Sequence, residues 1–325
     1  MKKKILLSFL CLMACLHVSA QNFTVGDIKY KVLSAEDKTC EIIGNIGVYG
    51  NVSLPVNVEY DASTYTVTSI AEEAFESCSS LTSINIPEGV TRIGSFAFYG
   101  CSSLTSIDIP SSVTSINDGA FWYCSQLTSI IIPEGVKNIG DMAFYGCSSL
   151  ASITIPASVT TISDDTFTGC SSLTSITLSE GVKNIGENAF SGCSSLTSIA
   201  IPASVTTIDN GAFRGCSSLT SITIPTSVTT ISNYTFTGCS SLTSITIPTS
   251  VTSIGDWAFA DCSSLAFITI PSAVTTIGKG AFSGCTDLTS ISLPENIENI
   301  GDEAFNDCKN LVSISLPEKI ESIGE

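Results

Sequence analysis

Cysteine is the residue whose spacing in this sequence most suggests chemistry. Eleven cysteines recur at a constant interval of 23 residues. Four converging thiolates would bind zinc, and two facing thiols would form a disulfide. A fixed period of about 20 to 50 residues is also the signature of a solenoid, whose successive coils place equivalent residues in register. The row consists of Cys78, Cys101, Cys124, Cys147, Cys170, Cys193, Cys216, Cys239, Cys262, Cys285 and Cys308.

The geometry of a stack of coils disfavours both kinds of thiol chemistry. Equivalent residues would lie in a straight row about 4.8 Å apart, whereas zinc needs four ligands that converge about 2.3 Å from one ion. A disulfide needs facing Cβ atoms about 3.8 Å apart, and side chains in register point the same way. We therefore expect no metal site, and free thiols that fill a buried corner of each coil.

Catalytic residues are also not expected. The only histidine is His17, in a segment that is interpreted below as an export signal. Without it, the chain has no Ser-His or Cys-His nucleophile system. Near-identical coils offer the same residues everywhere, whereas an active site needs several different ones at one place. We expect a protein that is not an enzyme and that binds no cofactor.

Each repeat has the pattern of one solenoid coil. With its cysteine numbered as position 1, a coil has apolar residues at positions 4, 7, 9, 13, 16, 20 and 21. Residues 104–109 alternate with the period of a half-buried strand, and the proline at position 10 ends that strand. A second short extended piece follows, and the A-F-x-G-C segment predicts a single helical turn closed by glycine. We expect a right-handed parallel solenoid, stable only as a stack.

The pattern C-x-x-L-x-x-I-x-I-P-x-x-V-x-x-I-G-x-x-A-F resembles the bacterial BspA-like leucine-rich repeat, a 23-residue class. The match extends over about residues 67–325. This resemblance implies a curved leucine-rich-repeat solenoid with one parallel β-strand per coil. It also implies adhesion or protein binding outside the cell.

The first residues predict export. Residues 1–20 combine three lysines, an apolar core and small residues before Gln21, which is the pattern of a signal peptide. The apolar run is too short for an ordinary membrane span. An alternative interpretation takes residues 12–15 as a lipoprotein box with a lipid on Cys15, although Met13 fits that box poorly. We expect a protein at the cell surface or outside the cell, attached to a membrane only through such a lipid.

Net charge excludes one class of partner. Removal of residues 1–20 changes the balance from 13 basic and 30 acidic residues to 10 and 30, a net charge of −20. Such an acidic surface repels phosphate backbones and anionic lipid head groups. We expect no nucleic-acid partner.

The mature chain divides into a terminal segment and the repeats. Residues 21–64 lack the 23-residue pattern but contain strand-like pieces at 27–33 and 40–44. Because a solenoid exposes a sheet edge and core at its ends, we expect this segment to be a cap. Residues 65–325 then form eleven coils, the last incomplete.

Aromatic residues break the regularity of the predicted surface at position 22, directly after the core phenylalanine. Three successive coils carry an aromatic ring there, and later coils carry small or polar residues such as Thr168 and Ser191. Stacking would align the rings along the outer face, where aromatics among polar residues are typical binding anchors. The residues are Tyr99, Trp122 and Tyr145, flanked by Phe96, Tyr123 and Met142.

A second candidate lies on the strand face. The outward positions 6 and 8 of each strand are mostly serine and threonine, which gives a flat surface of hydroxyl groups. Asp108, Ile131 and above all Phe267 interrupt it. Phe267 is therefore a second candidate binding residue.

These observations leave three hypotheses for function. The first is a surface adhesin or other protein-binding module whose partners are extracellular or host proteins. The second is a glycan-binding accessory protein of the cell surface, with the position 22 rings as its platform. The third is a structural spacer without a specific ligand.

Overall fold

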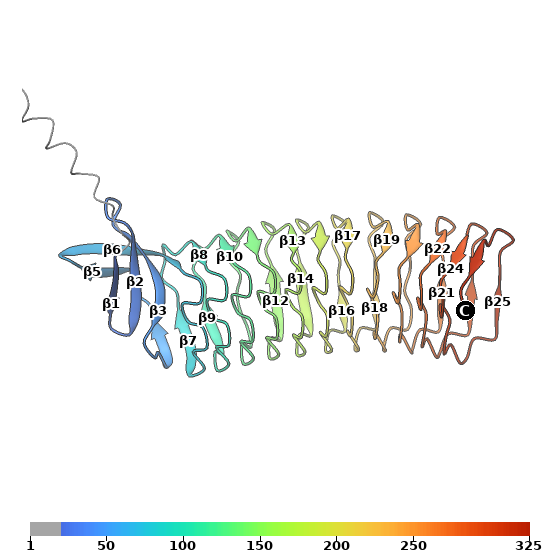
Figure 1. Ribbon diagram of the computed structural model, residues 1–325, viewed down its shortest axis with the longest axis horizontal. Coiled ribbons are helices and arrows are strands. Elements are labelled where there is room, and N and C mark those ends of the chain that lie inside the picture. Colours follow the sequence, from blue (N-terminus) through green and yellow to red (C-terminus); the bar gives the residue numbers. More distant parts are fainter. Residues whose placement is uncertain (1–20) are drawn as a thin grey trace, which may run out of the picture.

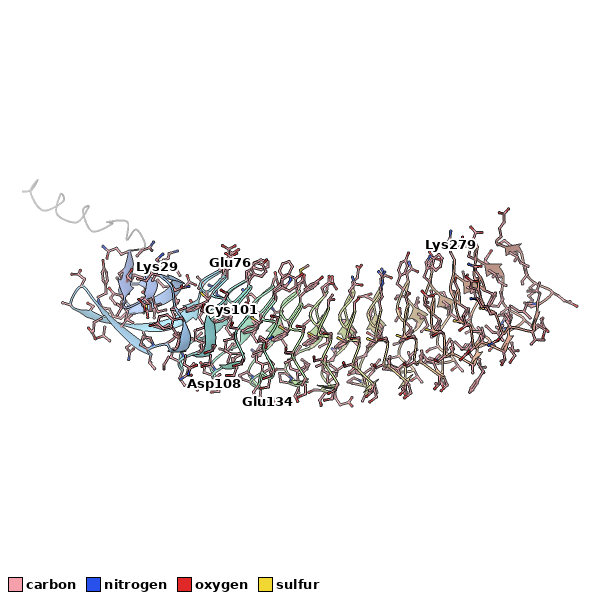
Figure 2. The ribbon with its side chains drawn as sticks, turned by 90° about the horizontal axis from the view of Figure 1, so that it is seen from below. Lys29, Glu76, Cys101, Asp108, Glu134 and Lys279 are labelled. Atoms are coloured by element: carbon pink, nitrogen blue, oxygen red, sulfur yellow. The ribbon has the colours of Figure 1, made fainter. Side chains whose placement is uncertain are left out.

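The computed structural model describes residues 21–325, which form one elongated, gently bowed stack of coils (Figures 1 and 2). The export signal expected at residues 1–20, with Cys15 and His17, lies outside the described residues. This architecture confirms the leucine-rich-repeat solenoid. None of the residues 21–325 is helical, so this part of the chain has no helix that could cross a membrane.

Two sets of short parallel strands line opposite sides of the coils. The first set, the strand face, occupies positions around 6 to 9, and the second occupies positions 15 and 16. The strand face comprises β4 (Gly50–Ser53), β7 (Leu81–Asn85), β9 (Ser106–Asp108), β12 (Ser152–Ile155), β14 (Ser175–Leu178), β16 (Ser198–Ile199), β18 (Ser221–Ile222), β21 (Phe267–Thr269), β23 (Ser290–Ser292) and β25 (Ser313–Ser315). The second set comprises β6 (Ser63–Ile70), β8 (Arg92–Ile93), β10 (Ser115–Ile116), β11 (Asn138–Ile139), β13 (Thr161–Ile162), β15 (Asn184–Ile185), β17 (Thr207–Ile208), β19 (Thr230–Ile231), β20 (Ser253–Ile254), β22 (Thr276–Ile277), β24 (Asn299–Ile300) and β26 (Ser322–Ile323).

Every coil pairs with its neighbour in strict register. Ile153 pairs with Ile176, and Ile116 pairs with Ile139, each partner lying 23 residues further along the chain. The apolar positions read from the sequence therefore become buried columns that run along the stack. In the phenylalanine column from Phe75 to Phe305, neighbouring ring centroids are 5.2–5.7 Å apart and the planes differ by 2–14°.

The helical turn predicted near the end of each coil is absent. Instead, the N–H groups at positions 19, 21 and 23 donate to carbonyls of the next coil, as Phe96 does to Asp118 at 2.9 Å and Phe98 to Ala120 at 2.8 Å. Left-handed backbone at positions 19 and 23, with φ of 55° at Phe96 and 71° at Gly100, aims these groups along the stack. The neighbouring coil offers acceptors in register, so a hydrogen-bond ladder between coils replaces the helix. We call positions 17–23 the turn edge.

Hydroxyl groups add further ladders between coils. The side chain of Thr105 donates to the carbonyl of Thr82 at 3.0 Å, and Ser112 donates to that of Val90 at 2.8 Å. Equivalent bonds recur in many other coils, at positions 2, 5, 12 and 14. Much of the serine and threonine content thus donates hydrogen bonds to backbone carbonyls of the neighbouring coil.

The N-terminal segment continues both sets of strands. It contains β1 (Asn22–Val25), β2 (Ile28–Ser34), β3 (Thr39–Asn45) and β5 (Asn57–Tyr60), with β1–β2–β3 antiparallel. Strand β3 pairs in parallel with β6, and β4 pairs in parallel with β7. The ladders therefore begin before the first recognisable repeat. We propose that residues 21–64 cap this end of the stack, since β1–β3 extend the sheet beyond β6.

The cysteine column is buried, and its thiols take part in the ladders. Nine of the eleven phased cysteines are fully buried, while Cys78 and Cys308 at the two ends are partly buried. From Cys101 to Cys308, each thiol donates to the carbonyl of the phenylalanine 26 residues earlier in the chain, at 3.1–3.3 Å. All twelve cysteines of residues 21–325 are free thiols. Their role as hydrogen-bond donors goes beyond the space-filling role that the sequence predicted.

An ion pair between a half-exposed arginine and a buried carboxylate joins the N-terminal strands to the first coil. Glu41 in β3, Ser69 in β6 and Arg92 in β8 lie side by side on adjacent strands. Arg92 Nη2 is 2.6 Å from Glu41 Oε1, and the Ser69 hydroxyl donates to the same oxygen at 3.0 Å. The Glu41 side chain is only 10% exposed, so these two partners replace hydrogen bonds that water would otherwise donate to its carboxylate.

Replacement of Arg92 by alanine should destabilise the protein by about 1 to 3 kcal/mol, because the buried Glu41 carboxylate keeps only one hydrogen bond. Lys279→Ala is the control: its pair with Glu303 is 3.7 Å long and half exposed on both sides, so the loss should stay below about 1 kcal/mol. Urea unfolding measures both. Equal, small losses of stability in the two variants would show that the pairing of the buried Glu41 carboxylate with Arg92 contributes little.

The buried thiols should make the protein sensitive to alkali. Burial raises the pKa of Cys170 and of Cys239 to about 12, from an ordinary value of 9.0. Thiols of the unfolded chain ionise above about pH 9, whereas the folded protein keeps these two protonated. Their contribution to stability is therefore complete below pH 9 and is lost as the pH rises towards 12.

The test compares the wild type with the double variant Cys170→Ala/Cys239→Ala, under reducing conditions, by urea unfolding between pH 8 and pH 11. Each thiol removed should make the loss of stability above pH 9 shallower by about 1.4 kcal/mol per pH unit. Other groups titrate in the same range, so the test relies on the difference between the wild-type and variant slopes of stability against pH. Parallel slopes would show that these thiols do not stay protonated.

Candidate binding surface

Five aromatic side chains gather on the turn edge of three successive coils, near the N-terminal end of the stack. Trp122 is at the centre: its ring centroid lies 5.4 Å from that of Tyr99 and 5.5 Å from that of Tyr145. Phe96 and Tyr123 are 5.8 Å and 5.7 Å away from it. The structure thus brings together the three predicted residues and two of their predicted neighbours. We call these five residues the aromatic cluster.

Glycines one coil further on provide room for two of the rings. A Cβ atom on Gly119 would lie 2.5 Å from the Phe96 ring, and one on Gly146 would lie 2.5 Å from the Tyr123 ring. Any larger residue at these positions would displace the ring. The signal was present in the sequence, since a glycine follows each of these aromatics after 23 residues, but only the strict register between coils gives it meaning.

The aromatic cluster combines exposed ring surface with an unsatisfied polar atom. The Tyr123 side chain is 47% exposed, and the other four rings are partly buried. The indole Nε1 of Trp122 is buried and has no hydrogen-bond partner, which costs about 1 to 3 kcal/mol. The serine or threonine of later coils would avoid this cost. Stability alone therefore does not explain a tryptophan at this position.

Carboxylates lie beside the aromatic cluster. The Phe96 N–H donates to the Asp118 carbonyl, and the Met142 N–H donates to the Asp164 carbonyl, both at 2.9 Å. These aspartates and Asp141 occupy position 18 of successive coils and are exposed. Partial burial of its carboxyl group, together with repulsion from Asp118 and Asp164, raises the pKa of Asp141 above its ordinary value. This part of the turn edge therefore concentrates negative charge.

Phe267 is not part of this surface. It begins β21 on the strand face, where its side chain is 61% exposed and pairs across the ladder with Ser290. It lies seven coils from Trp122. Figure 2 shows Glu76 and Lys279 of the turn edge on the side opposite Asp108 and Glu134, which belong to the strand side of the coils. Phe267 and the aromatic cluster therefore cannot contact one small ligand together.

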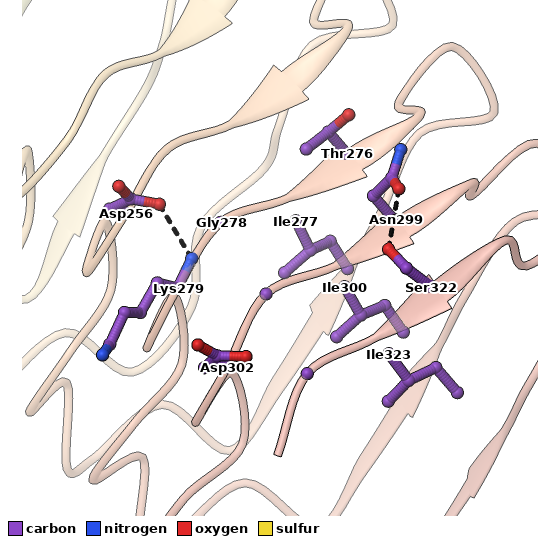
Figure 3. A pocket seen from close by; sticks show the side chains of 12 residues that line it. Asp256, Thr276, Ile277, Gly278, Lys279, Asn299, Ile300, Asp302, Ser322 and Ile323 are labelled. Carbon is purple, nitrogen blue, oxygen red and sulfur yellow. Dashed lines mark hydrogen bonds between the residues drawn. The ribbon is translucent and has the colours of Figure 1, made fainter.

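A hollow of about 500 Å³ lies on the last coils (Figure 3). Its polar groups belong to the ladders of the repeat: the Lys279 N–H donates to Asp256 Oδ1, and the Ser322 hydroxyl donates to Asn299 Oδ1, both at 2.8 Å. These residues repeat those of other coils and offer no distinct catalytic set. Within residues 21–325, no three His, Cys, Asp or Glu side chains are placed to hold a metal ion.

Comparison with known proteins identifies relatives of the same architecture. The chain resembles a leucine-rich cell surface protein from Faecalibacterium prausnitzii with 33% identity, over 93% of this chain and 90% of that one, at a TM-score of 0.68. A leucine-rich repeat protein from Bacteroides ovatus is also 33% identical, over 92% and 95% of the two chains, at a TM-score of 0.54. The pneumococcal vaccine antigen PcpA shares the fold at 21% identity, over 93% and 92%, at a TM-score of 0.64. No curated protein matches the chain.

A family model for the BspA type leucine-rich repeat region matches six copies, over residues 57–174, 137–265 and 229–325. These overlapping matches cover every recognisable repeat. Together with the solenoid and its 23-residue register, they show that the chain belongs to the BspA-type leucine-rich repeat family.

Proposed function

We propose that this chain is an exported, non-enzymatic protein that binds other proteins outside the cell, in the manner of an adhesin, and that the aromatic cluster is its binding site. The main observation behind this proposal is that the aromatic cluster interrupts the regular repeat. The coils repeat the same buried columns, whereas within residues 21–325 the aromatic cluster occurs in one place only. Exposed aromatic surface beside polar residues is typical of binding hot spots.

Three further observations support this proposal. Residues 1–20 have the sequence pattern of an export signal. The relative from Faecalibacterium prausnitzii is described as a cell surface protein. The buried indole N–H of Trp122 lacks a partner, and such costs are commonly retained at functional sites. A spacer without a ligand would have no reason to keep it.

The test begins with an array of host extracellular proteins and glycans, probed with residues 21–325. Binding of the selected protein is then measured for the variant Tyr99→Thr/Trp122→Ser/Tyr145→Thr. Later coils carry such residues at position 22, for example Thr168, Ser191 and Thr237, so the fold should persist, which circular dichroism checks. Loss of a hot-spot aromatic costs about 2 kcal/mol or more. Affinity should therefore fall at least tenfold.

Phe267→Ser is the matched control, since serine is the usual residue at that position and the change leaves the turn edge intact. Its affinity should stay within about twofold of the wild type. Unchanged affinity of the triple variant would rule out the aromatic cluster as the site, and a loss confined to Phe267→Ser would move the site to the strand face. Selection of glycans alone would favour the glycan-binding hypothesis, and selection of nothing would favour the spacer.

A further inference from the structure

The turn edge around the aromatic cluster carries charge of one sign. The five segments 71–77, 94–100, 117–123, 140–146 and 163–169 contain seven acidic residues and no lysine, arginine or histidine. All of these acidic residues except Asp165 are exposed, among them Glu76, Asp118, Asp141 and Asp164. Glu76 occupies position 22 in the coil that precedes Tyr99, and the Ser77 N–H donates to the Tyr99 carbonyl at 2.6 Å. Carboxylates therefore border the aromatic cluster on three sets of coils: Glu76 in the preceding coil, Asp118 and Asp141 in the coils of Trp122 and Tyr145, and Asp164 in the following coil.

None of these carboxylates is neutralised within residues 21–325. The two ion pairs of this part of the protein are Arg92–Glu41 and Lys279–Glu303, and both lie elsewhere. The raised pKa of Asp141 reflects burial and then the neighbouring charges of Asp118 and Asp164. A cation placed here would relieve that repulsion, whereas an anionic ligand would increase it.

The orientation of the rings favours cations over sugars. The Tyr99 and Trp122 planes differ by 52°, those of Trp122 and Tyr145 by 63°, and those of Tyr123 and Tyr145 by 84°. Rings tilted in this way form no flat platform across coils on which successive sugar rings could stack. A lysine or arginine side chain, in contrast, needs only a single face of tryptophan or tyrosine.

We infer that the partner of the aromatic cluster is a lysine- or arginine-rich polypeptide segment, whose cationic side chains lie on the tyrosine and tryptophan faces and pair with the bordering carboxylates. This inference rests on the proposed function and specifies the chemistry of its ligand. The same arrangement excludes phosphorylated or sulfated ligands by repulsion.

A short synthetic peptide in which lysine alternates with serine tests the inference directly. The test uses the variant Trp257→Phe, in which Trp122 is the only tryptophan left. The fluorescence of Trp122 then reports binding at the aromatic cluster. We expect a saturable change in emission that weakens as salt rises from about 0.05 M to about 0.5 M, because exposed charges are screened. The glutamate-for-lysine peptide, the lysine-acetylated peptide and a neutral oligosaccharide should give no such change.

Specificity is tested by neutralising the carboxylates. In the same background, Asp118→Asn/Asp141→Asn/Asp164→Asn preserves the ladder, because Asn210 and Asn233 already accept the N–H of the next coil at this position, at 3.2 Å and 2.8 Å. The control Glu295→Gln/Glu298→Gln/Glu318→Gln removes the same charge from the last coils. Affinity for the lysine peptide should fall at least tenfold in the first variant and less than about twofold in the control.

Each other outcome overturns the inference. Equal losses in the two variants would show attraction by net charge alone, and binding of the neutral oligosaccharide without binding of the lysine peptide would assign a glycan ligand. Absence of any fluorescence change with the lysine peptide would also refute it. The failures are separable: if a protein found on the array needs the three aromatic residues but not the carboxylates, this inference fails and the proposed function stands.

Discussion

The structure depends on one constraint, which is that every coil places its hydrogen-bonding groups opposite the same groups of the next coil. Peptide groups pair through two sets of strands and along the turn edge, hydroxyl groups donate to carbonyls between them, and cysteine thiols donate to phenylalanine carbonyls. A lone coil has no such partners, so the stability of the array comes from contacts between neighbours. Insertion or loss of one residue within a coil would shift part of that coil out of register with its neighbours, which accounts for the invariant interval of 23 residues.

The same constraint decides where function can lie. Residues that point inwards or along the stack are committed to core columns and ladders, so binding is left to outward side chains on the strand face and the turn edge. A repeated outward residue gives a uniform surface. Specificity then requires a departure from the repeat, and the aromatic cluster with its border of carboxylates is such a departure.

The sequence predicted the features that follow from periodicity. The register, the buried columns and the alignment of Tyr99, Trp122 and Tyr145 all follow from spacing, because equivalent residues must meet when coils stack. It did not predict the conformation of the turn edge, since A-F-x-G-C is compatible with a helical turn and the acceptors that replace the helix belong to the next coil. The sequence did not predict that β3 and β4 take part in the ladders, because these strands lie outside the 23-residue repeat. The seating of Phe96 over Gly119 depends on contacts between coils that no single repeat contains.

The central claim is that the coils are interchangeable except where the binding site lies. Two deletions of 23 residues each test this claim most directly. Removal of residues 203–225 joins Pro202 to Thr226, and removal of residues 111–133 joins Pro110 to Glu134, so both keep the register of the stack. Thermal unfolding and affinity for the protein selected on the array are measured for each. We predict that both proteins fold, that the first binds like the wild type, and that the second, which lacks Trp122, Tyr123 and Asp118, binds at least tenfold more weakly. Equal binding by the two deletions, or unfolding of the first, would contradict the account.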